Sequence, residues 1–253
     1  MTLHAEWTKL RTSPGTAWLL LAIVALTATL GALADAATRC PSAGCGLDPA
    51  RVGLTGVYLS QAVVVILGAL AIGAEYNSGM IKVTLSAMPR RLNVLAAKAV
   101  IITGLVLASA TLAVLGSLSA GLLILPGRGF TTAHGFTMVD GPVLRAYAGT
   151  VLYLALIGLL SLGAAAALRD TAAAIGIVLG LLYVLPIVAT VVSSATWHRH
   201  LEQLAPMTAG LAIQDTVGLR DLPITPWAGL GVLAAWAAAA LLAGALVLRL
   251  RDA

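Results

Sequence analysis

The sequence predicts an all-α polytopic membrane protein with six transmembrane helices and both termini on the cytoplasmic side. Of its 253 residues, 60% are hydrophobic and only 10% are charged, whereas soluble domains average about 25% charged residues. Six stretches that lack Asp, Glu, Lys and Arg exceed 20 residues. Their apolar residues do not alternate with polar ones, as those of a membrane β-barrel strand would.

Each uncharged stretch is long enough for one membrane crossing and too short for two, because a hydrocarbon core of ~30 Å needs about 20 apolar residues in a helix. The uncharged stretches are residues 12–34, 52–74, 99–127, 146–168, 171–198 and 222–248. We therefore expect a single transmembrane domain over residues 1–253. Its expected spans are residues 16–34, 53–74, 96–125, 144–168, 171–194 and 227–249.

Basic residues predict the orientation. With both termini inside, nine Lys and Arg residues fall on the cytoplasmic side and six on the outer side, which agrees with the positive-inside rule. The two sides then carry net charges of +5 (9 − 4) and 0 (6 − 6). Insertion into the plasma membrane explains the basic charge of the chain, and no nucleic acid partner is needed.

Residues 1–13 predict a helix in the membrane interface before the first span. Leu3, Trp7 and Leu10 form one apolar stripe at i, i+4 and i+7. Such a stripe, with Trp beside charged residues, is typical of helices that lie in the interface. The charged residues of this segment are Glu6, Lys9 and Arg11. The alternative is an irregular start of the chain with Trp7 as an aromatic anchor.

The expected outer segments hold two distinct features. Cys40 and Cys45 lie in "CPSAGC", which the topology places outside the cell, in an oxidising compartment. We expect them to form a disulfide, and the alternative is two free thiols. A zinc site is disfavoured, since no nearby His completes four ligands. Residues 195–224 mix apolar and polar residues with Pro206 and Gly210 as breakers, which predicts short helices at the outer surface.

Inside the spans, the residues predict packing rather than chemistry. Gly176 with Gly180, and Gly116 with Ala120, are spaced for close helix contact, and Pro186 predicts a kink in the fifth span. No charge lies at the midplane of a span, which argues against proton-coupled transport. HExxH, GxSxG and Walker A sequences are absent. We expect a chain that is not an enzyme, binds no cofactor or metal, and cannot hydrolyse ATP by itself.

The cytoplasmic connection at residues 75–92 has room for a helix of its own. Met80, Val83, Met88 and Leu92 give it a partly apolar face. A positive-inside topology signal alone would explain its arginines. It would not explain Glu75, Tyr76, Gly79 or the helix-like stretch before Pro89, so we predict a distinct structural role.

Three segments match the motifs of a known family. They are "EWTKLRT" at 6–12, "EYNSGMIKVTLSAMPRRLNVLAAKAV" at 75–100 and "LAPMTAGLAI" at 204–213. With the six spans, they resemble the membrane permease subunits of type-2 ATP-binding-cassette (ABC) exporters, in particular the short actinobacterial kind. Residues 6–12 resemble the interfacial helix of those permeases. Residues 75–100 resemble their E-Y-x-x-G-x-(I/L)-x-x-T-L-x-x-x-P-R-R segment, which is followed by a third span that begins with Lys. Residues 204–213 resemble their outer element before the last span.

The resemblance implies that residues 75–92 form a coupling helix docked on a separate cytoplasmic ABC ATPase subunit, which binds ATP and Mg²⁺. It also implies a second permease, either another copy of this chain or a paralogue, in the lipid bilayer. The coupling positions carried over from the motif are Glu75, Tyr76, Gly79, Met80, Lys82, Thr84, Leu85, Pro89, Arg90 and Arg91.

We therefore expect an export permease that moves a hydrophobic or amphiphilic compound, such as an antibiotic, a lipid or a lipopeptide, out of the cell. Export of this kind would confer antibiotic or multidrug resistance. One alternative is an ATPase-coupled membrane anchor or signalling subunit that transports nothing. A secondary transporter is a less favoured alternative.

Overall fold

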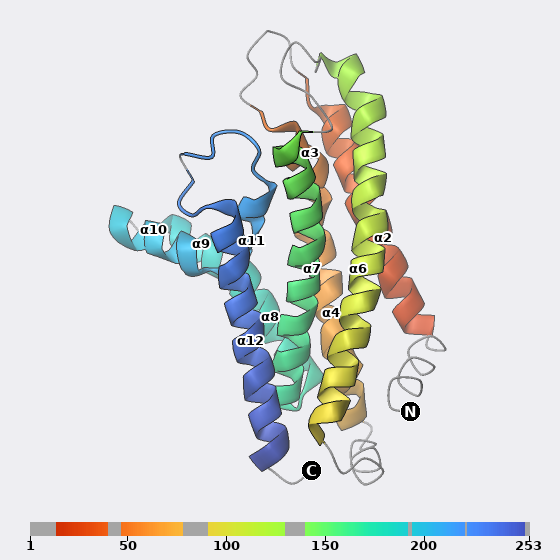
Figure 1. The fold of residues 1–253 in the computed structure, drawn as a ribbon, viewed down its shortest axis with the longest axis vertical. Coiled ribbons are helices and arrows are strands. Elements are labelled where there is room, and N and C mark those ends of the chain that lie inside the picture. Colours follow the sequence, from red (N-terminus) through yellow and green to blue (C-terminus); the bar gives the residue numbers. More distant parts are fainter. Residues whose placement is uncertain are drawn as a thin grey trace.

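The computed structural model describes residues 14–39, 47–77, 91–129, 140–191, 194–220 and 222–250. These residues fold into helices (Figure 1), and no strand occurs among them. Six of their helical stretches are long and apolar enough to cross a membrane. The predicted all-α class and the six helices of membrane-spanning length are confirmed.

The long apolar helices of the first part of the chain are α2 (Pro14–Ala37), α4 (Val57–Asn77), α6 (Arg91–Ile124) and α7 (Gly141–Leu168). The short helix α3 (Pro49–Gly53) and the 3-10 turn η1 (Leu54–Gly56) lead into α4, and the 3-10 turn η2 (Leu125–Arg128) follows α6. The rest comprises α8 (Thr171–Leu179), the π-helical turn η4 (Gly180–Val184), α9 (Leu185–Val191), α10 (Ala195–Leu204), α11 (Pro206–Leu211), the 3-10 turn η5 (Ala212–Gln214) and α12 (Pro226–Leu250).

Helix α7 lies at the centre of the bundle and packs against α12, α4 and α6, while α2 packs against α6 and α4 (Figure 1). Glycines bring these helices into backbone contact. A Cβ atom built on Gly68 of α4 would lie 2.5 Å from the Gly158 carbonyl oxygen of α7, and one on Gly163 of α7 would lie 2.5 Å from the Ala240 carbonyl carbon of α12. Small residues at helix contacts are the usual device for close packing in membranes.

The fifth long apolar stretch is interrupted beside Pro186, where the sequence predicts a kink. The π-helical turn η4 separates α8 from α9 and ends at Val184, two residues before the proline. Proline donates no backbone hydrogen bond and its ring crowds the preceding turn. A π-helical turn is one way in which a helix accommodates such a disturbance.

The bundle has two distinct ends (Figure 1). The lower end in this view holds the end of α4, the start of α6, the turn between α7 and α8, and the end of α12. The upper end holds α3, η2 and the start of α7. Helix α10 does not run along the bundle but projects sideways from it.

Two charged residues are buried in helices. The sequence predicts Asp35 just after the first span, on the outer side, whereas it belongs to α2 and is fully buried. Lys98 falls near the cytoplasmic start of the expected third span, and it belongs to α6 and is 2% exposed. The helices extend beyond the uncharged stretches, so the position of a charge in sequence marks only approximately where a helix ends.

Candidate functional site

The predicted coupling residues that the structure describes lie at the lower end of the bundle. Glu75 and Tyr76 belong to the last turn of α4, and Arg91 is the first residue of α6. The other coupling positions lie outside the described residues: Gly79, Met80, Lys82, Thr84, Leu85, Pro89 and Arg90. The predicted interfacial residues Glu6, Trp7, Lys9, Leu10 and Arg11, and the cysteines Cys40 and Cys45, also lie outside them.

Tyr76 contacts the turn between α7 and α8. The Arg169 guanidinium carbon lies 5.9 Å from the centroid of the Tyr76 ring, which is a cation–π distance. The Arg169 Nη2 group also donates a hydrogen bond of 3.2 Å to the Val247 carbonyl oxygen in α12. The Arg169 backbone is left-handed, with φ 58°, as is common for the residue that ends a helix. One side chain therefore connects the ends of α4, α7 and α12.

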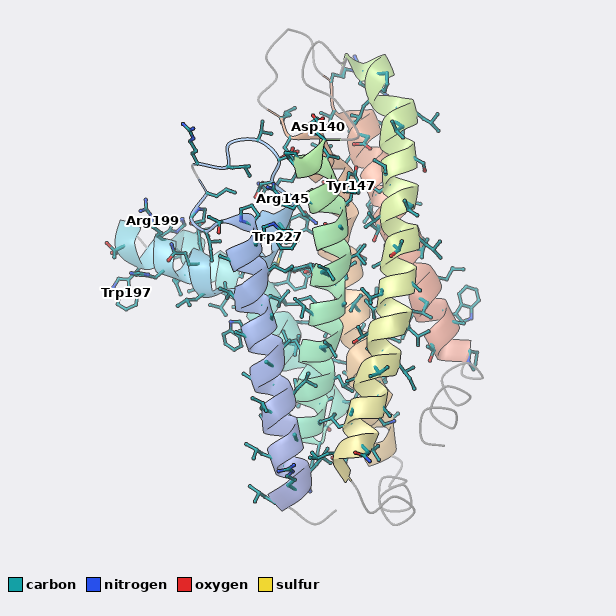
Figure 2. The ribbon with its side chains drawn as sticks, viewed as in Figure 1. Asp140, Arg145, Tyr147, Trp197, Arg199 and Trp227 are labelled. Atoms are coloured by element: carbon teal, nitrogen blue, oxygen red, sulfur yellow. The ribbon has the colours of Figure 1, made fainter. Side chains whose placement is uncertain are left out.

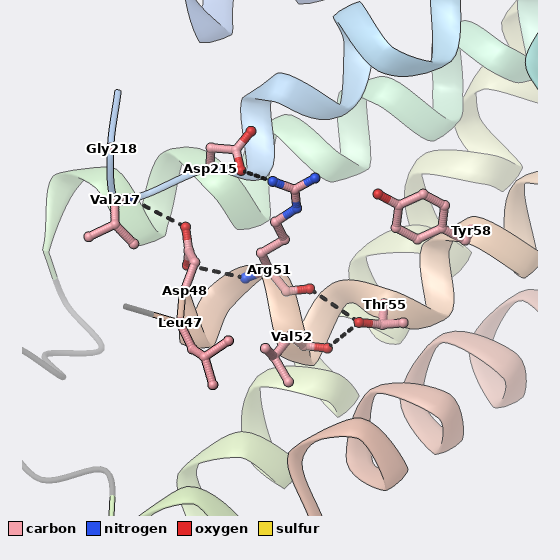
Figure 3. Close-up of a pocket in the computed structure, with 9 residues that line it drawn as sticks. All are labelled: Leu47, Asp48, Arg51, Val52, Thr55, Tyr58, Asp215, Val217 and Gly218. Atoms are coloured by element: carbon pink, nitrogen blue, oxygen red, sulfur yellow. Dashed lines mark hydrogen bonds and ion pairs between the residues drawn. The ribbon is translucent and has the colours of Figure 1, made fainter. Parts of the chain in front are cut away.

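The upper end of the bundle holds a cavity of about 460 Å³ between α3, the start of α4 and the segment after η5 (Figure 3). Its lining combines charged, hydroxyl, aromatic and aliphatic groups. The lining residues are Leu47, Asp48, Arg51, Val52, Thr55, Tyr58, Asp215, Val217 and Gly218. They come from two segments that are far apart in the sequence.

An ion pair between Arg51 and Asp215 joins these two segments. The Arg51 Nη1 group donates to Asp215 Oδ1 at 2.6 Å, and the side chains are 52% and 9% exposed, respectively. The Arg145 guanidinium of α7 donates to the Asp215 carbonyl oxygen, and the Tyr58 hydroxyl points toward the Arg51 guanidinium (Figure 3). Burial raises the pKa of the Asp215 carboxyl above its ordinary value, and Arg51 offsets this only in part.

Asp48 makes a second connection between the same segments. Its Oδ1 atom accepts hydrogen bonds from the backbone N–H groups of Ala50 and Arg51, at 3.1 and 3.3 Å, and so caps α3. Its carboxylate also accepts bonds from the Thr216 backbone and hydroxyl and from the Val217 N–H. One carboxylate therefore begins a helix and holds the η5–α12 connection against it.

A second cavity, of about 400 Å³, adjoins the first and shares Arg51, Tyr58 and Asp215 with it. Its remaining lining residues are mostly apolar. They are Pro186, Glu202, Met207, Thr208, Leu211, Ala212, Leu222 and Pro223. Concave sites with apolar walls and a few placed polar groups are typical of small-molecule binding.

A buried polar cluster lies behind the second cavity. The fully buried Tyr153 hydroxyl of α7 donates to Gln61 Oε1 of α4. The Gln61 amide donates to Met207 Sδ at 3.4 Å and to the Tyr58 carbonyl oxygen at 3.2 Å, and that oxygen also accepts a bond from Tyr183 of η4. These bonds join α4, α7, α11 and η4 through side chains inside the bundle.

The chemistry of these groups suits binding. Within the described ranges, no three His, Cys, Asp or Glu side chains gather as ligands for a metal ion. Asp35 is fully buried, and neither of its carboxylate oxygens has a hydrogen-bond partner among the described residues. The upper cavities instead combine an ion pair, a phenol and apolar walls, a lining that fits an amphiphilic molecule.

The sequence did not predict the upper cavities, because Asp48, Arg51 and Asp215 fall between the expected spans, where charged residues are common. One local signal was present: Asp48 precedes Pro49, and an acceptor followed by proline at the first helical position marks a helix start. No local pattern pairs Arg51 with Asp215, since the two residues come from segments that meet only in the fold.

No protein-family model matches the chain, and no curated protein matches it.

Proposed function

We propose that the chain is the permease subunit of an ATP-driven ABC exporter, which moves a hydrophobic or amphiphilic compound out of the cell. A separate ATPase subunit would bind and hydrolyse the ATP. The observation that carries this proposal is the contact of Tyr76 with Arg169 and of Arg169 with Val247. The segment that resembles a coupling helix starts at the last turn of α4. A displacement of this segment would move Tyr76 and so act through Arg169 on the α7–α8 turn and on α12.

Helix α12 extends this connection toward the upper end. Its residue Trp236 donates from Nε1 to the Leu204 carbonyl oxygen at the end of α10, at 3.0 Å, and α12 also packs against α11 and η5. Those elements border the second cavity. A movement of α12 would therefore alter the cavity, and binding of a molecule there would in turn bias the position of α12.

The two adjoining cavities support the proposed class of cargo. They present Tyr58, Met207 and Leu211 beside the Arg51–Asp215 ion pair. An amphiphilic compound can place its apolar part against such walls and its polar part against the ion pair. A second copy of the chain, or a paralogue, would complete the transport path in this proposal.

The test is to express the affinity-tagged chain together with the products of its neighbouring genes, and to purify the resulting complex through the tag. We expect the ATPase to copurify and its ATP hydrolysis in liposomes to rise with amphiphilic compounds. A complex that hydrolyses ATP but moves none of a panel of amphiphiles would favour the signalling subunit. Transport by the chain alone that follows a proton gradient would favour a secondary transporter.

A further inference from the structure

Helix α10 carries its large apolar side chains on one face, at whose edge the exposed His200 ring packs against Trp197. Trp197, Leu201 and Leu204 fall at i, i+4 and i+7, and Trp197 and Leu204 are 66% and 61% exposed. The opposite face carries His198, Arg199, Glu202 and Gln203. Figure 2 shows Trp197 pointing toward the lower end of the bundle and Arg199 toward the upper end.

The helix is held firmly in this sideways position. His198 Nδ1 lies 2.8 Å from the Ala189 carbonyl oxygen of α9, and Gln203 Nε2 donates to the Pro223 carbonyl oxygen at 2.7 Å. The Trp236 indole binds the Leu204 carbonyl oxygen from α12. The orientation of both faces of α10 is therefore fixed by three neighbouring segments.

A third cavity, of about 550 Å³, lies over the polar face of α10. Its lining residues are His198, Arg199, Glu202, Gln203, Arg220, Leu222 and Pro223. Arg199 and Arg220 are both exposed and make no hydrogen bond or ion pair within the part of the chain that the structure describes. Glu202 faces His198, with Oε1 3.3 Å from Nε2. Among its described residues, the lining thus carries two guanidinium groups without an ion-pair partner and one carboxylate. Asp221 follows Arg220 in sequence and lies outside the described residues.

We infer that this cavity binds the phosphate of an anionic membrane lipid, with α10 lying in the plane of the membrane interface. The exposed apolar stripe of Trp197 and Leu204 would enter the acyl chains, and the two arginines would reach the headgroup layer directly above it. Aromatic side chains favour this depth, and guanidinium groups bind phosphate oxygens through paired hydrogen bonds. A free phosphate would not explain an apolar stripe placed directly beneath a basic cavity.

The experiment measures lipid retention by native mass spectrometry of the purified full chain, exchanged into mixed phosphatidylglycerol and phosphatidylcholine nanodiscs. We expect the wild type to retain phosphatidylglycerol selectively. Arg199→Gln with Arg220→Gln should weaken that retention about 25-fold, at about fivefold for each arginine near a membrane surface. The matched control is Arg39→Gln with Arg128→Gln, which removes the arginine that follows α2 and the one that ends η2, and should leave retention unchanged.

Two further measurements separate the elements of the proposal. Doxyl-labelled lipids should quench the fluorescence of Trp197, identified by its loss in Trp197→Phe, and absence of that quenching would overturn the interfacial position of α10. Inorganic phosphate at millimolar concentration should not displace the lipid, and displacement would show a site for free phosphate instead. Unchanged lipid selectivity in Arg199→Gln with Arg220→Gln would overturn the site itself. None of these outcomes depends on an ATPase partner or on transport.

Discussion

The Arg169 guanidinium lies over the ring of Tyr76, with the two centres 5.9 Å apart. Tyr76 belongs to the last turn of α4, and Arg169 lies between α7 and α8, so this contact joins two elements at the lower end of the bundle. The same guanidinium binds the Val247 carbonyl oxygen of α12. A force applied to the segment after Tyr76 would reach two further helices through one side chain.

Loss of the aromatic ring at Tyr76 should weaken this end of the bundle. Tyr76→Leu removes the cation–π partner of Arg169 and should lower the free energy of unfolding by about 1 kcal/mol. Tyr76→Phe keeps the ring face and should stay closer to the wild type. Chemical unfolding of the detergent-solubilised chain would measure the difference, and equal losses in the two variants would show that the ring contact contributes nothing.

A methyl group at Gly31 should disrupt the packing of α2 against α3. A Cβ atom there would lie 2.1 Å from the Gly53 carbonyl oxygen and 3.0 Å from Ser117 Oγ. Since the obstacle is backbone, the helices must separate, and we expect Gly31→Ala to cost about 3 kcal/mol or more. Gly104→Ala is the matched control, because nothing lies within 4 Å of its added Cβ. Similar melting temperatures for both variants would contradict the close contact of α2 with α3.

The hydrogen bond between Tyr153 and Gln61 should show coupling in a double-mutant cycle. Tyr153→Phe leaves the buried Gln61 Oε1 without its donor, and an unsatisfied buried polar group costs about 1–3 kcal/mol. Gln61→Leu with Tyr153→Phe removes both groups and should cost less than the sum of the single variants. Additivity within about 0.5 kcal/mol would mean that the two groups do not interact.

Asp215 should make stability depend on pH. Burial raises the pKa of its carboxyl in the folded protein, so the folded state holds this proton over a pH range where the unfolded state has released it. The free energy of unfolding should therefore fall as pH rises from about 4 through the folded-state pKa of Asp215. Asp215→Asn should lack this contribution. Parallel stability profiles for the variant and the wild type would contradict the assignment.

The positions of charged residues and the lengths of the uncharged stretches were enough to predict the helical class and the six long helices. The reason is that a charged side chain raises the free energy of any span that carries it into the hydrocarbon core. Helix contacts were harder to predict. Gly116 contacts Ala28 of α2, as its spacing suggested, but nothing lies within 4 Å of a Cβ atom built on Gly176 or Gly180. A small residue permits close contact without specifying which helix, if any, lies against it.

The upper cavities could not be predicted from local sequence. Arg51, Tyr58 and Asp215 meet because α4 and the η5–α12 connection lie together at one end of the bundle. Their pairing depends on tertiary packing, which one sequence does not specify. The predicted coupling positions differ, because they lie within residues 75–91 and were recognised from a sequence motif alone. The contact of Tyr76 with Arg169 joins distant segments and was not predicted.

The central claim is that the segment ending in Arg90 and Arg91 receives the energy of a partner ATPase. Its most direct test is ATP-driven transport by the complex reconstituted in liposomes, comparing Arg90→Glu with Arg91→Glu against the control Arg249→Glu with Arg251→Glu. Loss of two charge-assisted contacts at about tenfold each should reduce ATPase binding and transport about 100-fold, while the control stays near the wild type. Full assembly and transport by the Arg90→Glu, Arg91→Glu variant would contradict the claim.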